Sequence, residues 1–334
     1  LTVQFAMAFV MVNLLEQNQF LEQVPFGLEN KVIDLAAGFR SYLCTKNLSS
    51  KDGAYRLADT LISGKMLEFI ENGSLSLEAA HNSIEFIKEE GDKSILGEKL
   101  IFDMDEVQLL SPIEKSYSLR DFLSFELHLK NARARRGKEV PSVWYEIPIY
   151  YKGNVSSIVG PEDAIEWPSY SNFMDYELEM ACIIGKSGKN ISKEEAEDHI
   201  FGYTIMNDFS VRDMQFKETE GGLGPAKGKD FATAFGPYII TKDELPDPYH
   251  LRMTAKINGE LWSDGNSNSM YRKFTDMIAY ASQDENISAG DIFGSGTVGN
   301  GCGLELGKQL KDGDIIELEI EHLGVLKNQV FTKK

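Results

Sequence analysis

The chain has 334 residues, of which 42% are hydrophobic and 26% are charged, a composition typical of a globular protein. Its 34 basic and 52 acidic side chains give a net charge of −18, which argues against nucleic acid and anionic membranes as partners because both select basic surfaces. The three cysteines are far apart and form no paired metal motif. We therefore expect a reducing, cytoplasmic setting.

The first 107 residues are predicted to form a mixed, partly helical region, either a small domain or a dimerisation element. The apolar run at residues 5–12 is shorter than the roughly 20 residues that span a bilayer, and no basic residue precedes it. It therefore predicts a buried strand or helix. At residues 79–90, Ala80, Ile84 and Ile87 share one stripe, which predicts a helix that ends at Gly91.

Residues 108–334 are predicted to form a catalytic domain dominated by short strands. Asn258-Gly259, between alternating flanks, predicts a β-hairpin. Further strands are expected at residues 176–184, 201–205, 238–241 and 315–321, and helices at residues 119–137, 192–200 and 274–282. The pattern favours an α+β, β-rich fold with a rolled or barrel-like mixed sheet and few helices.

Carboxylates at two strand positions are the first candidate site. Glu177 and Glu179 are two residues apart on a predicted strand, so both side chains leave the same face. Two like charges on a partly buried face repel unless a cation lies between them, and oxygen ligands favour a hard divalent ion. A solvated edge strand is the alternative. Asp208 follows an apolar strand and is either a further site residue or part of a turn.

A histidine on the predicted helix at residues 119–137 is the second candidate. Asp121, Phe125 and His128 fall near one helical face, which leaves a functional and a structural histidine equally open. The basic run at residues 130–138 is interpreted as a solvated helix face or as a means of attracting an anionic substrate.

Two glycine-rich loops complete the candidates. The loop at residues 221–236 lacks the ending of a nucleotide-binding P-loop and is predicted to place a lysine, Lys227 or Lys229, over an anion. Residues 294–303 contain a GxGxxG pattern, but strand-like residues follow it, so we reject a dinucleotide site. We instead expect backbone N–H groups that bind an oxyanion or carboxylate. Glu305, between two leucines, is predicted to be buried.

Taken in order, six segments resemble the fumarylacetoacetate hydrolase family: DFLSFELH, YYKGN, DYELEMACIIGK, GYTIMNDFSVRDMQ, GPAKGKDFATAFGPY and GDIFGSGTVGNG. The resemblance extends from about residue 109 to the C-terminus. It implies a rolled mixed β-structure, a homodimer and a central divalent cation, with Mg²⁺ expected first and Mn²⁺ or Ca²⁺ as alternatives. The first hundred residues do not resemble the SH3-like domain of the animal enzyme.

The resemblance also implies a role for individual residues. Asp121, Glu177, Glu179 and Asp208 correspond to the metal carboxylates of the family. His128 corresponds to the general base, Glu305 to the carboxylate that orients it, and Lys229 and Gln215 to the pair that holds a developing oxyanion. Tyr151, Arg212 and Thr297 correspond to substrate-binding positions. Leu123 departs from the family, because some members have a tyrosine there, and Thr219 and Glu220 replace an aromatic substrate contact.

These roles predict hydrolysis of a carbon–carbon bond in an acylpyruvate or related β-diketo acid, similar to fumarylacetoacetate or fumarylpyruvate. His128, held by Glu305, would activate water, and the metal would stabilise the departing enolate. The alternative is a 2-oxo acid decarboxylase, isomerase, hydratase or dehydratase, similar to 2-hydroxyhepta-2,4-diene-1,7-dioate isomerase. A metal-stabilised binding module without turnover is disfavoured by the presence of a base, a lysine and metal carboxylates together.

Overall fold

The computed structural model describes residues 8–14, 20–23, 31–135 and 137–333. A large mixed sheet has the strand order β2 (Phe20–Gln23), β1 (Ala8–Leu14), β14 (Thr233–Thr241), β12 (Ile200–Asp208), β11 (Leu178–Ile184), β17 (Ile292–Gly294), β6 (Leu119–Phe122) and β7 (Tyr150–Gly153). β5 (Val107–Leu109) also pairs with β1, and β8 (Ile158–Val159) with β14. The pairs β17–β6 and β14–β8 are parallel, whereas the other pairs in this sheet are antiparallel.

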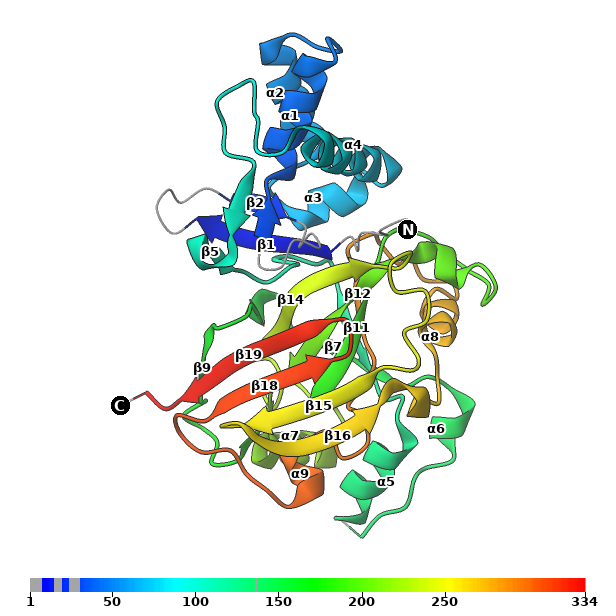
Figure 1. Cartoon of the computed structure of the whole chain (residues 1–334). Helices are drawn as coiled ribbons and strands as arrows, with labels where there is room; N and C mark the ends of the chain where they lie inside the picture. Colours follow the sequence, from blue (N-terminus) through cyan, green and yellow to red (C-terminus); the bar gives the residue numbers. More distant parts are fainter. Residues whose placement is uncertain (1–7, 15–19, 24–30, 136, 334) are drawn as a thin grey trace.

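A second sheet covers one face of the first (Figure 1). Its strand order is β16 (Glu260–Asn266), β15 (Arg252–Ile257), β18 (Ile315–Ile320), β19 (Gly324–Phe331) and β9 (Ala164–Glu166). Two short pairs join β10 (Met174–Asp175) to β13 (Ser210–Val211) and β3 (Lys31–Ile33) to β4 (Ile101–Asp103).

Four helices pack at one end of the molecule, at the top of Figure 1: α1 (Leu35–Thr45), α2 (Lys51–Leu61), α3 (Met66–Glu71) and α4 (Ser74–Glu90). Their apolar side chains share a core with the face of the large sheet opposite the second sheet. The other helices are α5 (Glu126–Ala134), α6 (Val143–Glu146), α7 (Arg212–Glu220), α8 (Phe274–Ala281) and α9 (Gly303–Leu306). Single 3-10 turns are η1 (Met104–Glu106), η2 (Val155–Ser157), η3 (Ala196–His199) and η4 (Ser267–Ser269).

Strand β11 is buried on both faces, which decides where its acidic residues point. Met180 and Cys182 belong to the core between the two sheets, whereas Ala181 and Ile183 belong to the core under the helices. Since side chains alternate along a strand, Glu179 lies on the same face as Ala181. The sheet therefore carries its carboxylates on the helix-covered face, beyond the end of the apolar core.

The structure confirms the α+β, β-rich fold and most of the predicted elements. The hairpin turn has φ of 52° at Asn258 and 80° at Gly259, as a type I′ turn requires. Helix α4 ends at Gly91 but begins earlier than predicted, at Ser74. Strand β12 extends beyond the predicted segment at both ends, and strand β14 begins five residues earlier than predicted but ends at Thr241 as expected.

The predicted helix at residues 119–137 is confirmed only at residues 126–134, and the one at residues 192–200 is wrong. Residues 119–137 are divided into strand β6 and helix α5, because residues 119–122 pair with β17 and β7 and are fully buried. Asp121 and His128 therefore do not share a helical face. At residues 192–200 the Ser192–Glu195 capping contacts form, but only the 3-10 turn η3 follows before β12 begins at Ile200.

The N-terminal predictions have mixed outcomes. Residues 8–12 of the apolar run lie in strand β1, whereas residues 5–7 lie outside the described residues. Because β1 pairs with β14, the chain crosses the predicted boundary at residue 107 within one sheet, and the two-domain division stays a prediction. Across the described ranges, we find no helix whose length and apolar character would let it cross a membrane.

Candidate metal centre and active site

Three buried carboxylates come from neighbouring strands of the large sheet. Asp121 lies on β6, Glu179 on β11 and Asp208 at the end of β12, and one oxygen of each lies within 4.8 Å of the others. Strand β17 runs between β11 and β6, and Gly294 faces both Ala181 and Asp121. A Cβ at Gly294 would lie 2.4 Å from Asp121 Oδ1. The absent side chain at Gly294 therefore gives the Asp121 carboxylate its space.

The hydrogen bonds of this carboxylate cluster leave acceptor capacity for a cation. Thr297 donates to Glu179 Oε1 at 3.1 Å, and Tyr151 donates its hydroxyl to Asp208 Oδ2 at 2.7 Å. The backbone N–H of Gly296 donates to Asp121 Oδ1 at 3.2 Å. Within the described part of the chain, Glu179 Oε2 and Asp208 Oδ1 are buried without a hydrogen-bond partner. Buried acceptors of this kind fit a hard divalent cation.

Electrostatics support the same interpretation. Burial and the charge of Asp208 raise the pKa of Asp121 well above its usual range, and burial and the charge of Asp121 raise the pKa of Glu179. The pKa of Asp208 is also raised, by burial, although Lys229 opposes the change. Three carboxylates in so small a volume repel one another unless protons or a metal ion neutralise them.

Glu177 lies beside this cluster with different partners. It accepts from Arg212 Nη1 at 2.8 Å and from Lys229, which also binds Asp208. Burial alone would raise the pKa of Glu177, but the charges of Lys229 and Arg212 outweigh burial and lower it. Burial lowers the pKa of Lys229, yet Asp208 and Glu177 together raise it above its usual range. Lys229 is therefore a fixed positive charge between two acidic groups.

Arg212 connects Glu177 to helix α9 through Asp175, a residue that the sequence analysis did not single out. Its Nε donates to Asp175 Oδ2 at 2.8 Å, and Asp175 also accepts from the backbone N–H groups of Gly303 and Leu304, at 2.8 and 2.9 Å. Arg212 Nη1 also donates to Gln215 Oε1 at 3.0 Å. Asp175 could have been found in the sequence, because it continues the two-residue alternation of Glu177 and Glu179.

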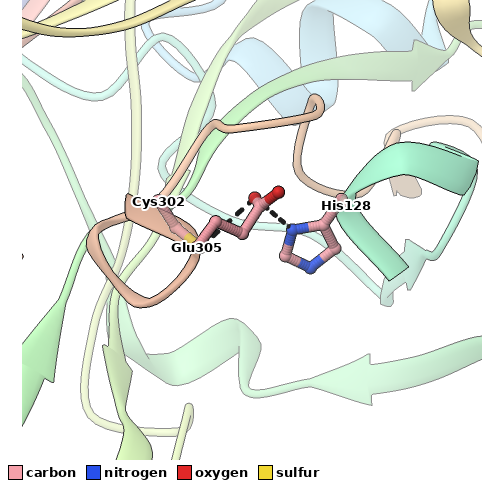
Figure 2. Close-up of side chains that lie close together, drawn as sticks. All are labelled: His128, Cys302 and Glu305. Atoms are coloured by element: carbon pink, nitrogen blue, oxygen red, sulfur yellow. Dashed lines mark hydrogen bonds and ion pairs between the residues drawn. The ribbon is translucent and has the colours of Figure 1, made fainter. Parts of the chain in front are cut away.

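The predicted His128–Glu305 pair is present (Figure 2). His128 on α5 and Glu305 on α9 are both buried, and Nδ1 lies 2.7 Å from Oε1. Glu305 Oε2 accepts from Asn131 Nδ2 at 2.9 Å and from the backbone of Asn300 at 2.8 Å. Burial raises the pKa of Glu305, but the bonds from His128 and Asn131 outweigh burial and lower it. These contacts therefore favour the ionised form of Glu305 and fix its position against His128.

The structure therefore brings the predicted residues into one region. Arg212 and Asp175 connect Glu177 to the first residue of α9, the helix that carries Glu305. Tyr151, Thr297 and Arg212, predicted to bind substrate, each contact a site carboxylate, so their predicted contacts with substrate stay predictions. Asn131, Asn300 and Cys302 were missed, because nothing in their local sequence marks them as neighbours of Glu305.

Comparison with known proteins decides the family. The protein-family model described as "Fumarylacetoacetate (FAA) hydrolase C-terminal" matches residues 118–331 of this chain. The chain belongs to the fumarylacetoacetate hydrolase family. It is 34% identical over 269 residues to "Oxaloacetate tautomerase fahd2, mitochondrial" from Xenopus laevis, an alignment covering 80% of this chain and 78% of the relative. It is 31% identical over 275 residues to "Oxaloacetate tautomerase YisK" from Bacillus subtilis (strain 168), covering 80% and 87%.

A solved structure shares the whole fold. Maleylpyruvate hydrolase from Sphingobium sp. SYK-6, in complex with manganese(II) and pyruvate, matches with a TM-score of 0.67 at 21% identity. The match covers 98% of this chain and 100% of that chain. Membership of the fumarylacetoacetate hydrolase family indicates that this protein is an enzyme. Its buried carboxylates are suited to a divalent metal. Cytoplasmic location stays a prediction, because the Xenopus relative is named mitochondrial.

Proposed function

We propose that this protein is a divalent-metal-dependent tautomerase that interconverts the enol and keto forms of a small anionic 2-oxo acid, with oxaloacetate as the first substrate to test. The observation that carries the proposal is the presence in one molecule of the buried carboxylate cluster of Asp121, Glu179 and Asp208 and the buried His128–Glu305 pair. The names of the Xenopus and Bacillus relatives support the substrate. An isomerase reaction, the alternative given by the sequence, is thereby favoured over hydrolysis of a carbon–carbon bond.

The metal is proposed to lie among Asp121, Glu179 and Asp208, with Glu177 as a further ligand and Mg²⁺ as the first ion to test, ahead of Mn²⁺ and Ca²⁺. A bound divalent cation would act as a Lewis acid toward the 2-oxo group of the substrate. Tyr151 and Thr297 would keep two of the carboxylates in place, because each donates a hydrogen bond to one of them. Lys229 would offset the negative charge around Asp208 and Glu177.

His128 is the proposed proton carrier. Tautomerisation moves one proton between the 2-oxygen and C3 of the substrate and breaks no carbon–carbon bond. Because Glu305 is ionised and accepts from Nδ1, the neutral ring carries its proton on Nδ1 and has a lone pair on Nε2, which points away from Glu305 (Figure 2). Nε2 accepts the enol proton and returns it to C3, while Glu305 stabilises the transient imidazolium.

Hydrolysis of an acylpyruvate is the second candidate, and the same pair favours it. A histidine oriented by a carboxylate is also suited to take a proton from water. Lys229 and Gln215 are then proposed to hold the oxyanion that forms at the attacked carbonyl. The two candidates differ in their products, since only hydrolysis yields two smaller acids.

The deciding experiment uses metal-stripped protein to which Mg²⁺ or Mn²⁺ is added back. Loss of the near-ultraviolet enol absorbance is followed for oxaloacetate and for a panel of acylpyruvates, with products identified by mass and with metal alone as the blank. A tautomerase accelerates enol loss from oxaloacetate without changing its mass. Cleavage of an acylpyruvate into pyruvate and an acid would support the hydrolase instead, and no acceleration of either would contradict both.

Substitution of His128 tests the proton carrier. His128→Gln should lower the tautomerisation rate by about 10²–10⁴ and leave Mn²⁺ binding intact, because the side chain that moves the proton is lost while the carboxylates stay. His199→Gln is the matched control, since His199 is also a buried histidine but binds the backbone oxygen of Lys186. A normal rate in His128→Gln would contradict the proposed role.

A further inference from the structure

A thiol lies against the His128–Glu305 pair and has no role in the proposed reaction. Cys302 Sγ is 3.5 Å from Glu305 Oε1, the same oxygen that lies 2.7 Å from His128 Nδ1 (Figure 2). Nitrogen, sulfur and oxygen donor atoms from His128, Cys302 and Glu305 all lie within 4.8 Å of one another. All three side chains are buried.

This donor set differs in chemistry from the carboxylate cluster. Imidazole, thiolate and a single carboxylate oxygen are ligands that Zn²⁺ takes in tetrahedral sites, whereas Mg²⁺ prefers oxygen ligands alone. One thiolate and one carboxylate also neutralise the charge of a divalent ion. The two sites should therefore select different metals in the same molecule.

The distances fit such an ion with little movement. Zinc bond lengths place sulfur and oxygen ligands of a tetrahedral site about 3.6 Å apart and nitrogen and oxygen ligands about 3.4 Å apart. The Sγ–Oε1 distance of 3.5 Å already matches. The Nδ1–Oε1 distance of 2.7 Å is shorter because a proton lies between these atoms, and exchange of that proton for a metal requires the two to separate slightly.

The surroundings of Glu305 prepare one oxygen for the metal. Oε2 is engaged by Asn131 Nδ2 and by the backbone N–H of Asn300, which fix the plane of the carboxylate. Oε1 is left to face Nδ1 and Sγ. Outer hydrogen bonds of this kind orient metal-binding carboxylates in proteins.

We propose that His128, Cys302 and Glu305 form a second metal site, selective for Zn²⁺ and similar thiol-binding ions, whose occupation inhibits the enzyme. The inhibitory part rests on the proposed function of His128, whereas the binding part does not. Binding releases the thiol proton of Cys302 to solvent. Coordination through Nδ1 moves the remaining proton of the neutral ring to Nε2. Nε2 then has no lone pair with which to accept a proton from substrate.

Binding is tested with Co²⁺ as a spectroscopic substitute for Zn²⁺, on protein whose carboxylate site is first saturated with Mg²⁺. Co²⁺ should produce a thiolate-to-metal charge-transfer band in wild type and in Cys44→Ser, but not in Cys302→Ser. Cys44 is the control thiol because it is half-buried on α1. Zinc X-ray absorption of the wild type should show one sulfur at about 2.3 Å, which requires no variant to fold. Absence of both signals would overturn the site.

Inhibition is tested by titrating Zn²⁺ against the rate at saturating Mg²⁺, with each variant compared with its own uninhibited rate. The half-inhibitory Zn²⁺ concentration should rise at least about tenfold in Cys302→Ser and stay unchanged in Cys44→Ser. Equal inhibition of Cys302→Ser and wild type would show that the inhibitory Zn²⁺ binds elsewhere, and it would overturn the proposal that this site inhibits the enzyme. If the protein turns over no 2-oxo acid yet shows the cobalt band, the proposed function fails and the metal site stands.

Discussion

Gly294 shows how one missing side chain shapes the proposed metal centre. It lies on β17 between the strands that carry Asp121 and Glu179, and a Cβ there would meet Asp121 Oδ1 at 2.4 Å and Met206 Sδ at 3.0 Å. Gly294→Ala should therefore displace Asp121 and weaken Mn²⁺ binding by about tenfold or more, because the ligands of a metal must keep their positions to within a fraction of an ångström.

Mn²⁺ affinity, measured by calorimetry, checks this prediction. Gly221→Ala is the matched control, since Gly221 has φ of −69° and an added Cβ would lie 3.3 Å from the nearest atom, the Glu218 carbonyl oxygen. Unchanged affinity in Gly294→Ala would show that Asp121 is not a ligand.

At the scale of elements, Arg212 joins α7 to the strand end at Glu177 and to the start of α9 through Asp175. Arg212→Met should lower the free energy of unfolding by about 3–5 kcal/mol, because it leaves Asp175 buried without its cation and leaves Glu177 with Lys229 alone. Urea unfolding measures the loss. Arg252→Met removes an exposed ion pair with Asp264 and should leave the unfolding midpoint nearly unchanged. Equal effects of the two substitutions would contradict the structural role of Arg212.

The elements also show what the sequence could predict. Alternation along residues 176–184 was enough to place Glu177 and Glu179 on one face, and the apolar strand before Asp208 was enough to place it at a strand end. Residues 119–122 were predicted as helix because a four-residue strand is too short to show its own periodicity, and its pairing with β17 and β7 is set by residues far away in the chain. The Arg212–Asp175 contact likewise depends on a long-range pairing, that of β10 with β13.

At the scale of the whole molecule, the raised pKa values of Asp121, Glu179 and Asp208 couple metal binding to pH. A carboxyl group whose pKa is raised in the folded state keeps its proton at pH values at which the same group in the unfolded chain has lost it. Stability without metal therefore falls as the pH rises from about 4 toward the raised pKa values. A divalent ion replaces the protons and removes this cost. The increase in melting temperature on adding Mn²⁺ should thus be larger near pH 6 than near pH 5, just above the usual carboxyl pKa.

Differential scanning calorimetry in buffers of matched ionic strength measures this increase. Asp208→Asn is the control, because it removes one proposed ligand and should remove most of the Mn²⁺ effect at both pH values. An increase independent of pH in the wild type would show that protons and metal do not compete for this cluster.

The proposal that metal held by the carboxylate cluster is required for turnover is tested most directly by one titration. Mn²⁺ is added in steps to metal-stripped protein. Electron paramagnetic resonance measures the bound Mn²⁺, and the rate of enol loss from oxaloacetate is measured in the same samples. The rate should rise in proportion to bound Mn²⁺ and saturate at one ion per chain, and both signals should be lost in Asp208→Asn. Full turnover by the metal-stripped protein would contradict the account.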